Sequence, residues 1–274
     1  ASDSHTDSDS ETDSVTISDS ASDLDTNFDT QSDSTSGTDT DSASADQCIH
    51  PPVEASCTDG WCTIPHGCFL YGAPPEEPCG VPDLEKQTEV VLTHDFVIAQ
   101  TEVTQAQWNS MGFNNPMSSD MICSDCPIGY VNWYDALAYC NALSIKEGLE
   151  PCYNLSGCEG VAGEGCPDRL FFGCSEGTYK CEYMVNRFEN HYKCPGYRLP
   201  TSAEWQYAAR AGTKTATYNG DLPSDLRKCE LQPILDPIAW HCGNTEKAMP
   251  VAQKLPNAWG LYDMLGNIYE LLSD

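Results

Sequence analysis

Cysteine is the residue type in this sequence whose number and spacing could support chemistry. All sixteen cysteines lie between Cys48 and Cys242. An even number at this density is typical of disulfides formed in an oxidising compartment. Cys123 and Cys126 have the Cys-x-x-Cys spacing of half a zinc site or of a redox motif, but no second such pair follows at zinc spacing. We therefore favour structural disulfides of unknown connectivity, with zinc binding and redox chemistry as alternatives.

Histidine offers little support for a metal centre. No two histidines have the helical spacing of a ligand pair, so iron bound by three histidines is disfavoured. No Ser-His-Asp signature, P-loop or dinucleotide-binding glycine motif stands out. The six histidines are His5, His50, His66, His94, His191 and His241.

The charge of the chain disfavours nucleic acid and anionic membranes as partners. Its 42 acidic residues outnumber 13 Lys and Arg, for a net charge of −29, and a negative surface repels both. Residues 1–46 contain 13 of the acids and no Lys or Arg. This Ser/Asp/Thr-rich segment has too little apolar area to fold, so it is predicted to be a disordered linker, either a surface spacer or a solubilising tail.

Residues 47–274 are predicted to form the folded domain. No apolar run is long enough to cross a membrane. Because the chain opens within a linker and lacks an initiator Met, we expect that a signal or lipid anchor was removed, or that this is a fragment. The location expected is outside the cytoplasm, secreted or lipid-anchored at a bacterial cell surface.

Strand and helix signals occur through the domain. Residues 88–93 and 95–99 are predicted to form a β-hairpin, and Trp61–Phe69 a short strand and turn. Helices are expected over residues 105–111, 133–145 and 202–211, with Thr104, Asn132 and Thr201 as their N-caps; the first two caps precede apolar-periodic segments, and Thr201-Ser-Ala-Glu204 is a capping box. On the second helix, Trp133, Ala136, Leu137, Cys140 and Leu143 form one apolar face. Residues 150–197 hold six cysteines and little periodicity, which indicates a disulfide-stapled irregular insertion.

Six segments in order resemble the formylglycine-generating enzyme, or sulfatase-modifying factor, family. The third and fifth are the most specific of them. The segments are Phe96–Thr104, Val131–Ala136, Tyr197–Trp205, Tyr207–Arg210, Pro256–Asp263 and Gly266–Glu270. The resemblance implies an α+β fold, a variant of the C-type lectin fold with short antiparallel strands, few helices and much irregular loop.

Two kinds of metal chemistry follow from this resemblance. By position, Asp263, the Gly266 and Ile268 carbonyls and Glu270 would hold a structural calcium, an ion that prefers oxygen ligands; a second site in the family is near Asn244. Family members also use a copper-binding cysteine pair to oxidise, with O2, a sulfatase cysteine to formylglycine. That pair would lie beyond Asp274, so we assign the catalytic and copper-binding roles to no residue and expect a truncated, inactive chain.

Two functions are therefore compared. The first is the scaffold part of a formylglycine-generating oxidase, whose partner is a sulfatase or another Cys-containing peptide. The alternative is a non-catalytic, lectin-like surface module that binds a peptide or glycan.

Overall fold

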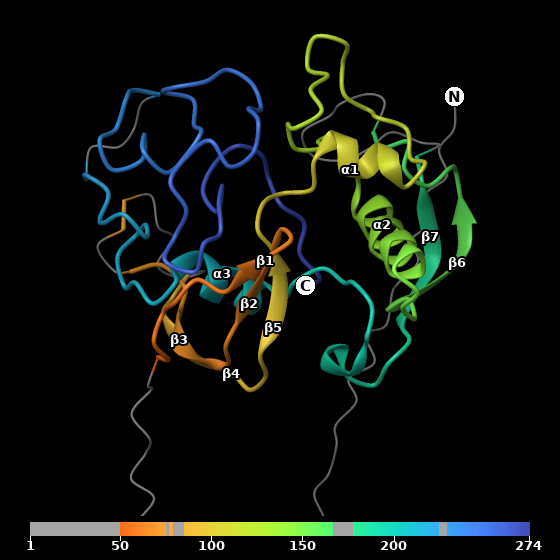
Figure 1. Ribbon diagram of the computed structural model, residues 1–274, viewed down its shortest axis with the longest axis horizontal. Coiled ribbons are helices and arrows are strands. Elements are labelled where there is room, and N and C mark those ends of the chain that lie inside the picture. The colour runs from red at the N-terminus through yellow and green to blue at the C-terminus, as the bar shows by residue number, and fades with distance from the viewer. Residues whose placement is uncertain (1–49, 75–76, 79–84, 167–177, 225–228) are drawn as a thin grey trace, which may run out of the picture. The chain divides into compact units, whose positions relative to one another are not determined.

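The computed structural model describes residues 50–74, 77–78, 85–166, 178–224 and 229–274. The chain divides into two units, Ala1–Ser44 and Ala45–Asp274, and the acidic segment predicted over residues 1–46 lies outside the described residues. The second unit is α+β: its described part has three short α-helices, small antiparallel sheets and long irregular connections (Figure 1). This confirms the predicted fold class. No helix in the described ranges is long and apolar enough to span a bilayer.

Two segments, 61–71 and 88–99, pair with each other as a bent antiparallel ribbon. β2 (Trp61–Ile64) pairs with β5 (Phe96–Ala99), and β3 (Gly67–Tyr71) pairs with β4 (Thr88–Leu92); β1 (Cys57–Thr58) adds to the free edge of β2. The predicted hairpin of residues 88–93 with 95–99 is therefore wrong, because β4 and β5 are consecutive parts of one arm. The ribbon breaks at Pro65, which has no N–H to donate to a ladder.

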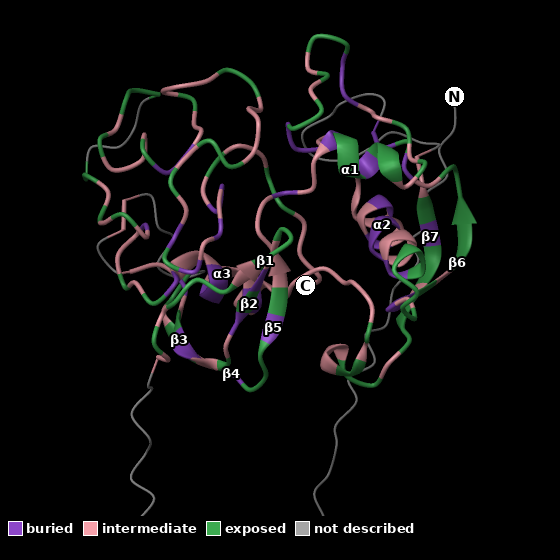
Figure 2. Cartoon of the chain, viewed as in Figure 1, coloured by how far each residue is buried: buried purple, intermediate pink, exposed green. Residues whose placement is uncertain are grey.

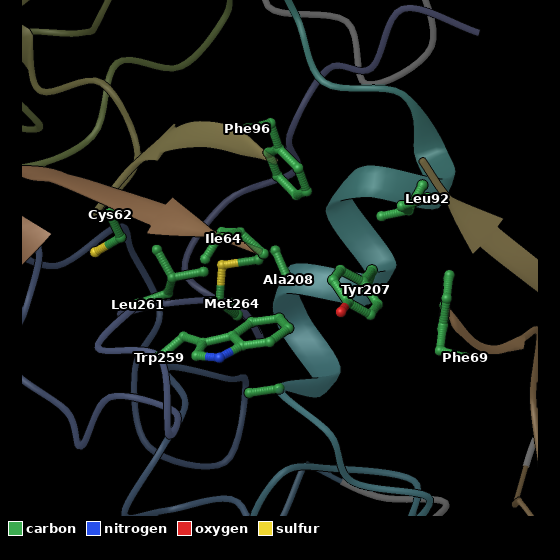
Figure 3. Close-up of a cluster of buried hydrophobic side chains, with 11 residues drawn as sticks. Cys62, Ile64, Phe69, Leu92, Phe96, Tyr207, Ala208, Trp259, Leu261 and Met264 are labelled. Atoms are coloured by element: carbon green, nitrogen blue, oxygen red, sulfur yellow. The ribbon is translucent and has the colours of Figure 1, made fainter. Parts of the chain in front are cut away.

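The helix α3 (Ser202–Arg210) sits against this ribbon and organises the main core. Its predicted capping box is confirmed: Thr201 accepts from the Glu204 N–H, and the Glu204 side chain accepts from the Thr201 N–H. Tyr207 and Ala208 bury their side chains against Trp259 and Leu261, as Figure 3 shows. The two most specific segments, 197–205 and 256–263, therefore belong to one packed body.

The helix α2 (Trp133–Lys146) separates two smaller clusters. The single apolar face predicted for it is incomplete. Tyr139, which lies outside that face, is also buried and packs on Trp108 of α1 (Gln105–Ser110). Leu137 and Cys140 pack on the other side, against Tyr153. Buried positions consequently appear on more than one side of α2 (Figure 2). Thr104 is the N-cap of α1 and Asn132 is the N-cap of α2, as the sequence predicted.

The cysteine-rich insertion contains regular structure. β6 (Tyr153–Glu159) and β7 (Lys180–Asn186) form an antiparallel hairpin beside α2, and the 3-10 helix η1 (His191–Lys193) follows it (Figure 1). The prediction of an irregular insertion over residues 150–197 is wrong for these strands. The disulfide Cys158–Cys181 links β6 to β7, and Cys152–Cys194 joins the residue before β6 to the residue after η1. Residues 167–177 lie outside the described part.

Candidate functional site

The cysteines are structural wherever the structure describes them. Twelve of the thirteen described cysteines are in disulfides. Cys123 is bonded to Cys126, which removes both as thiolate ligands for zinc. The remaining one, Cys140, is a free thiol buried on α2, and burial raises its pKa to about 12. A thiol with so high a pKa is neither a good nucleophile nor a good metal ligand at neutral pH.

The loop over residues 257–270 is held in an irregular conformation by side chains of its own. Asn257 is buried, and its Oδ1 accepts from the N–H groups of Trp259 and Leu261. Asp263 and Asn267 both have positive φ, 53° and 54°, a conformation that Asp and Asn tolerate better than most residues. Such a loop directs backbone carbonyls and side chains to one side, which regular structure cannot do.

Asp263 is the most buried acid of this loop. It is 2% exposed, and its Oδ2 accepts a 2.7 Å hydrogen bond from the Ala252 N–H. Its Oδ1 is buried without a hydrogen-bond partner among the described residues. Burial raises the pKa of Asp263, while the N–H of Ala252 and the positive charge of Lys254 act in the opposite direction. A buried carboxylate oxygen with no partner is costly, and it marks a place where a cation would be favourable.

Glu270 is close enough to Asp263 for the two charges to interact. Burial of its carboxyl group is the first cause that raises the pKa of Glu270 to about 7, and the charge of Asp263 adds to the effect; the Trp205 indole opposes it. By its solvent-accessible surface the whole residue Glu270 is nevertheless exposed. The resemblance therefore led to two acids that the fold does bring near one another.

The two carbonyls predicted as calcium ligands occupy the turn between these acids. Gly266 has φ +82°, and a Cβ there would clash with the Trp240 carbonyl oxygen, so only glycine fits. Neither the Gly266 nor the Ile268 carbonyl accepts a backbone hydrogen bond from another described residue. Neither oxygen is therefore committed to a backbone hydrogen bond within the described residues.

Sequence reasoning missed a third acid, Glu102, in the segment after β5. Glu102 is 8% exposed, and its Oε1 is buried without a partner among the described residues. Burial, then the charges of Asp263 and Glu270, raise its pKa to about 9. The signal was in the segment Phe96–Thr104, where an acid lies three residues after the end of a strand, but only the folded chain places it against residues 263–270.

The acids fit a hard cation better than a soft one. Oxygen ligands in an irregular loop suit calcium, and the described acids Glu102, Asp263 and Glu270 offer neither the sulfur nor the nitrogen ligands that softer ions prefer. No set of three or more His, Cys, Asp or Glu side chains in the described ranges already converges on one metal position.

Other candidate residues are occupied elsewhere. The Asn244 side chain, near the second calcium site of the family, accepts from the His241 N–H and donates to the Asp236 carboxylate and the Ala239 carbonyl. A cavity of about 100 Å³ lies between α2, the β6–β7 hairpin and the chain before α3, lined in part by Trp133, His191 and Arg198. It is small for a ligand site, since such sites usually have roughly 300–1,000 Å³.

Comparison with known proteins identifies a family and several proteins of similar sequence. The model of the sulfatase-modifying factor enzyme 1-like domain matches residues 49–274. The chain is 35% identical over 189 residues to the chaperone protein LppX of Paenibacillus barcinonensis, covering 66% of this chain and 62% of that protein. It is 38% identical over 84 residues to the formylglycine-generating enzyme of Thermomonospora curvata, covering 29% and 27% of the two chains. The matches therefore span less than two thirds of either curated relative.

The similarity to a solved structure also supports the fold. Treponema denticola variable protein 1 has a TM-score of 0.52 to this chain at 29% identity, over 80% of this chain and 75% of that one. The similarity extends well beyond the short segments with recognisable motifs, which agrees with a shared fold for residues 49–274.

Proposed function

We propose that this chain, which belongs to the sulfatase-modifying factor enzyme 1-like domain family, uses the fold to bind polypeptide segments outside the cytoplasm. The extracytoplasmic location follows from the disulfides, which form in oxidising compartments; attachment through a lipid is a further part of the proposal. The observation that carries the proposal is the solvent-exposed side chain of Tyr269 beside the acidic loop, and no described cysteine points to another chemistry. Each described cysteine is either in a disulfide or, like Cys140, buried, so none of them can serve cysteine-based oxidation.

A protein partner is supported by the relatives and by the surface beside the acidic loop. The Paenibacillus relative is named a chaperone, which is a protein-binding activity. Tyr269 lies next to Glu270, and its side chain is 88% exposed. An exposed tyrosine supplies a large apolar ring with a polar tip at low entropic cost, and such residues are enriched where proteins bind proteins.

Peptide binding can be measured directly with the purified, oxidised chain. Fluorescence anisotropy against a set of labelled peptides from unfolded exported proteins should show saturable binding. Tyr269→Ser should weaken the binding several-fold, because interface aromatics often contribute a large share of affinity. The matched control is Tyr183→Ser on β7, where the parent side chain is 58% exposed. Absence of saturable binding, or equal loss in both variants, would contradict the proposal.

Formylglycine generation is the second candidate, and the relatives named formylglycine-generating enzyme favour it. Copper(I), which supplies O2 activation in that family, prefers thiolate ligands, and the described residues offer it no pair of free thiols. We therefore derive no step through copper. A Cys-x-Pro-x-Arg peptide incubated with the chain, copper and O2 tests this candidate. Formylglycine detected by mass spectrometry would overturn the non-catalytic proposal.

A further inference from the structure

The cavity of about 100 Å³ beside α2 is a preformed space between the cysteine-rich insertion and the rest of the domain. Met184 and Phe188 line it from the insertion, and Trp133 lines it from α2. The Cys152–Cys194 disulfide, whose two cysteines both line the cavity, ties the residue before β6 to the residue after η1. Because this cross-link holds the walls in place, a ligand does not have to order them on binding.

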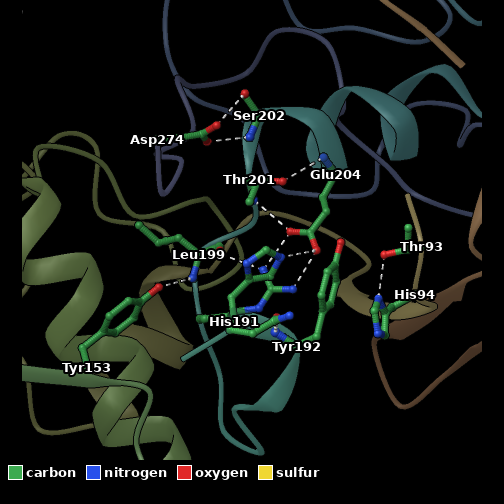
Figure 4. A network of polar contacts seen from close by, with 12 residues as sticks. Thr93, His94, Tyr153, His191, Tyr192, Leu199, Thr201, Ser202, Glu204 and Asp274 are labelled. Atoms are coloured by element: carbon green, nitrogen blue, oxygen red, sulfur yellow. Dashed lines mark hydrogen bonds and ion pairs between the residues drawn. The ribbon is translucent and has the colours of Figure 1, made fainter. Parts of the chain in front are cut away.

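Most of the side chains that line the cavity are apolar or aromatic. Tyr153 is fixed in the wall because its hydroxyl accepts a 2.9 Å hydrogen bond from the Leu199 N–H (Figure 4). Aromatic and sulfur-containing surfaces of this kind gain dispersion contacts with an apolar group. Apart from the disulfide, the apolar and aromatic lining residues are Trp133, Tyr153, Met184, Phe188 and Leu199.

The polar residues of the lining carry no uncompensated charge at neutral pH. Arg198 is paired with the Glu204 carboxylate through two 2.7 Å hydrogen bonds. Burial, and then the charge of Arg198, lower the pKa of His191, which keeps its imidazole neutral at pH 7.5. Asn186 and Ser273 are uncharged. A charged group in this cavity would lose water without meeting a free opposite charge, so the cavity favours an uncharged occupant.

The cavity lies on the same chain segment as Tyr269, the exposed side chain assigned above to polypeptide binding. Ser273 lines the cavity, and its N–H donates to the Pro200 carbonyl at 3.0 Å. The neighbouring Leu272 carbonyl accepts a 2.8 Å hydrogen bond from the Trp133 indole. Tyr269 precedes Ser273 by four residues, a distance of at most about 14 Å along an extended chain. An extended peptide of about five residues is therefore long enough to reach from one to the other.

We propose that this cavity receives one uncharged apolar side chain, of the size of leucine or methionine, from a polypeptide that contacts Tyr269. The proposal rests on the polypeptide binding proposed above and adds to it a preference for a class of side chain. The volume is right for a single side chain, since an apolar cavity of about 150 Å³ holds a benzene molecule. A sugar is a poor occupant, because its hydroxyl groups would lose water against largely apolar walls.

A photoreactive leucine tests the cavity by itself. N-acetyl-photoleucine amide, which carries a diazirine on a leucine-like side chain, is irradiated with the purified, oxidised chain, and the cross-links are located by peptide mapping. They should fall on the segments that contain Met184, Phe188 and Leu199. Excess N-acetyl-leucine amide should suppress them, whereas N-acetyl-aspartate amide should not. Cross-links that avoid these segments, or equal suppression by both amides, would overturn the proposal whether or not peptides bind.

Two identical substitutions on the hairpin provide a matched pair. Asn186 and Asn154 are both exposed, but only Asn186 lines the cavity. Asn154 is in register with Val185, so it faces the opposite side of the hairpin. Asn186→Trp should close the cavity and reduce cross-linking several-fold, and Asn154→Trp should leave it unchanged. Unfolding midpoints that agree within about 4 °C would show that neither variant has lost more than a small part of its stability. Equal cross-linking in the two folded variants would contradict the proposal.

Met184→Ala should change which side chain binds best, an effect that a merely structural role of Met184 would not produce. Labelled peptides that differ at one position, with alanine, leucine or phenylalanine, are compared by fluorescence anisotropy. The wild-type chain should bind the leucine peptide about tenfold or more tighter than the alanine peptide, because burial of the larger side chain is worth that much. The enlarged cavity of Met184→Ala should prefer phenylalanine.

The outcomes separate this proposal from the proposed function. Peptides whose binding depends on Tyr269 but is equal for all three side chains would overturn the cavity proposal and leave polypeptide binding intact. Peptides that fail to bind, while the photoreactive leucine still enters the cavity, would overturn polypeptide binding and limit the cavity to free small molecules.

Discussion

The guanidinium group of Arg198 donates two hydrogen bonds, each 2.7 Å, to the carboxylate of Glu204. The same carboxylate accepts from the Thr201 N–H at the start of α3 (Figure 4). Asp274 accepts from the N–H and hydroxyl groups of Ser202 next to it. One buried acid therefore fixes the chain before α3, and the residues at 273–274 pack against the same helix end.

Replacing Glu204 with Gln should destabilise the domain strongly. The change removes the negative partner and leaves the guanidinium of Arg198, 17% exposed at its side chain, without a counter-charge. Breaking a buried pair in this way costs roughly 3–5 kcal/mol in the free energy of unfolding. Urea denaturation measures it. Glu189→Gln is the control, since its exposed pair with Lys193 should contribute less than about 1 kcal/mol.

The same pair predicts how stability depends on pH. Burial alone would raise the pKa of Glu204, but the hydrogen bonds and charge of Arg198 more than offset it, so the pKa falls below its ordinary value of 4.5. An acid with a lower pKa in the folded state stabilises the fold above the unfolded pKa, and the contribution disappears as the pH falls through the folded value. The stability difference between wild type and Glu204→Gln should therefore shrink below pH 4.5. A difference that stays constant down to pH 3 would contradict this.

Asn257 joins the C-terminal loop to the end of α3. Its Nδ2 donates to the carbonyls of Ala208 and Ala209, at 2.8 and 3.2 Å, while its Oδ1 serves two loop N–H groups. Asn257→Ala should leave these buried groups unsatisfied, at roughly 1–3 kcal/mol for each group. Chemical denaturation measures the free energy of unfolding of this variant. The control is Asn154→Ala, at an exposed position on β6. Equal small losses in the two variants would show that the Asn257 hydrogen bonds contribute little.

Cys140 should be inert in the folded protein. Its pKa is raised to about 12 by burial, with Arg198 acting in the opposite direction, and its side chain is 8% exposed. Iodoacetamide at pH 8 should label it only after denaturation, because the thiolate is the reactive form. Peptide mapping by mass spectrometry identifies the labelled residue. Rapid labelling of Cys140 in the native state would show that α2 opens or that the thiol is more acidic than its surroundings indicate.

Local signals in the sequence were sufficient for the helices. Thr104, Asn132 and Thr201 are the caps in the structure because a hydroxyl or amide oxygen beside the first free N–H groups is a local interaction. The family motifs also pointed to α3 and to residues 256–270, two segments whose side chains pack together in the main core. Disulfide bonding was predictable from the number of cysteines, but connectivity was not, because it depends on which residues the fold brings within bonding distance.

Strand pairing and the arrangement of the acids depended instead on contacts between residues that are far apart in the sequence. Residues 88–93 and 95–99 alternate as strands whichever partner they take, and only the burial of Phe96 and Leu92 in the same core selects the ribbon with 61–71. Glu102 likewise carries no local sign of where it packs. The sequence by itself determined the helix starts, and its resemblance to the family determined the class of fold and directed attention to the acids of the C-terminal loop. Tertiary structure alone decided that Glu102 lies with them, because the proximity of residues so far apart is set by packing rather than by spacing.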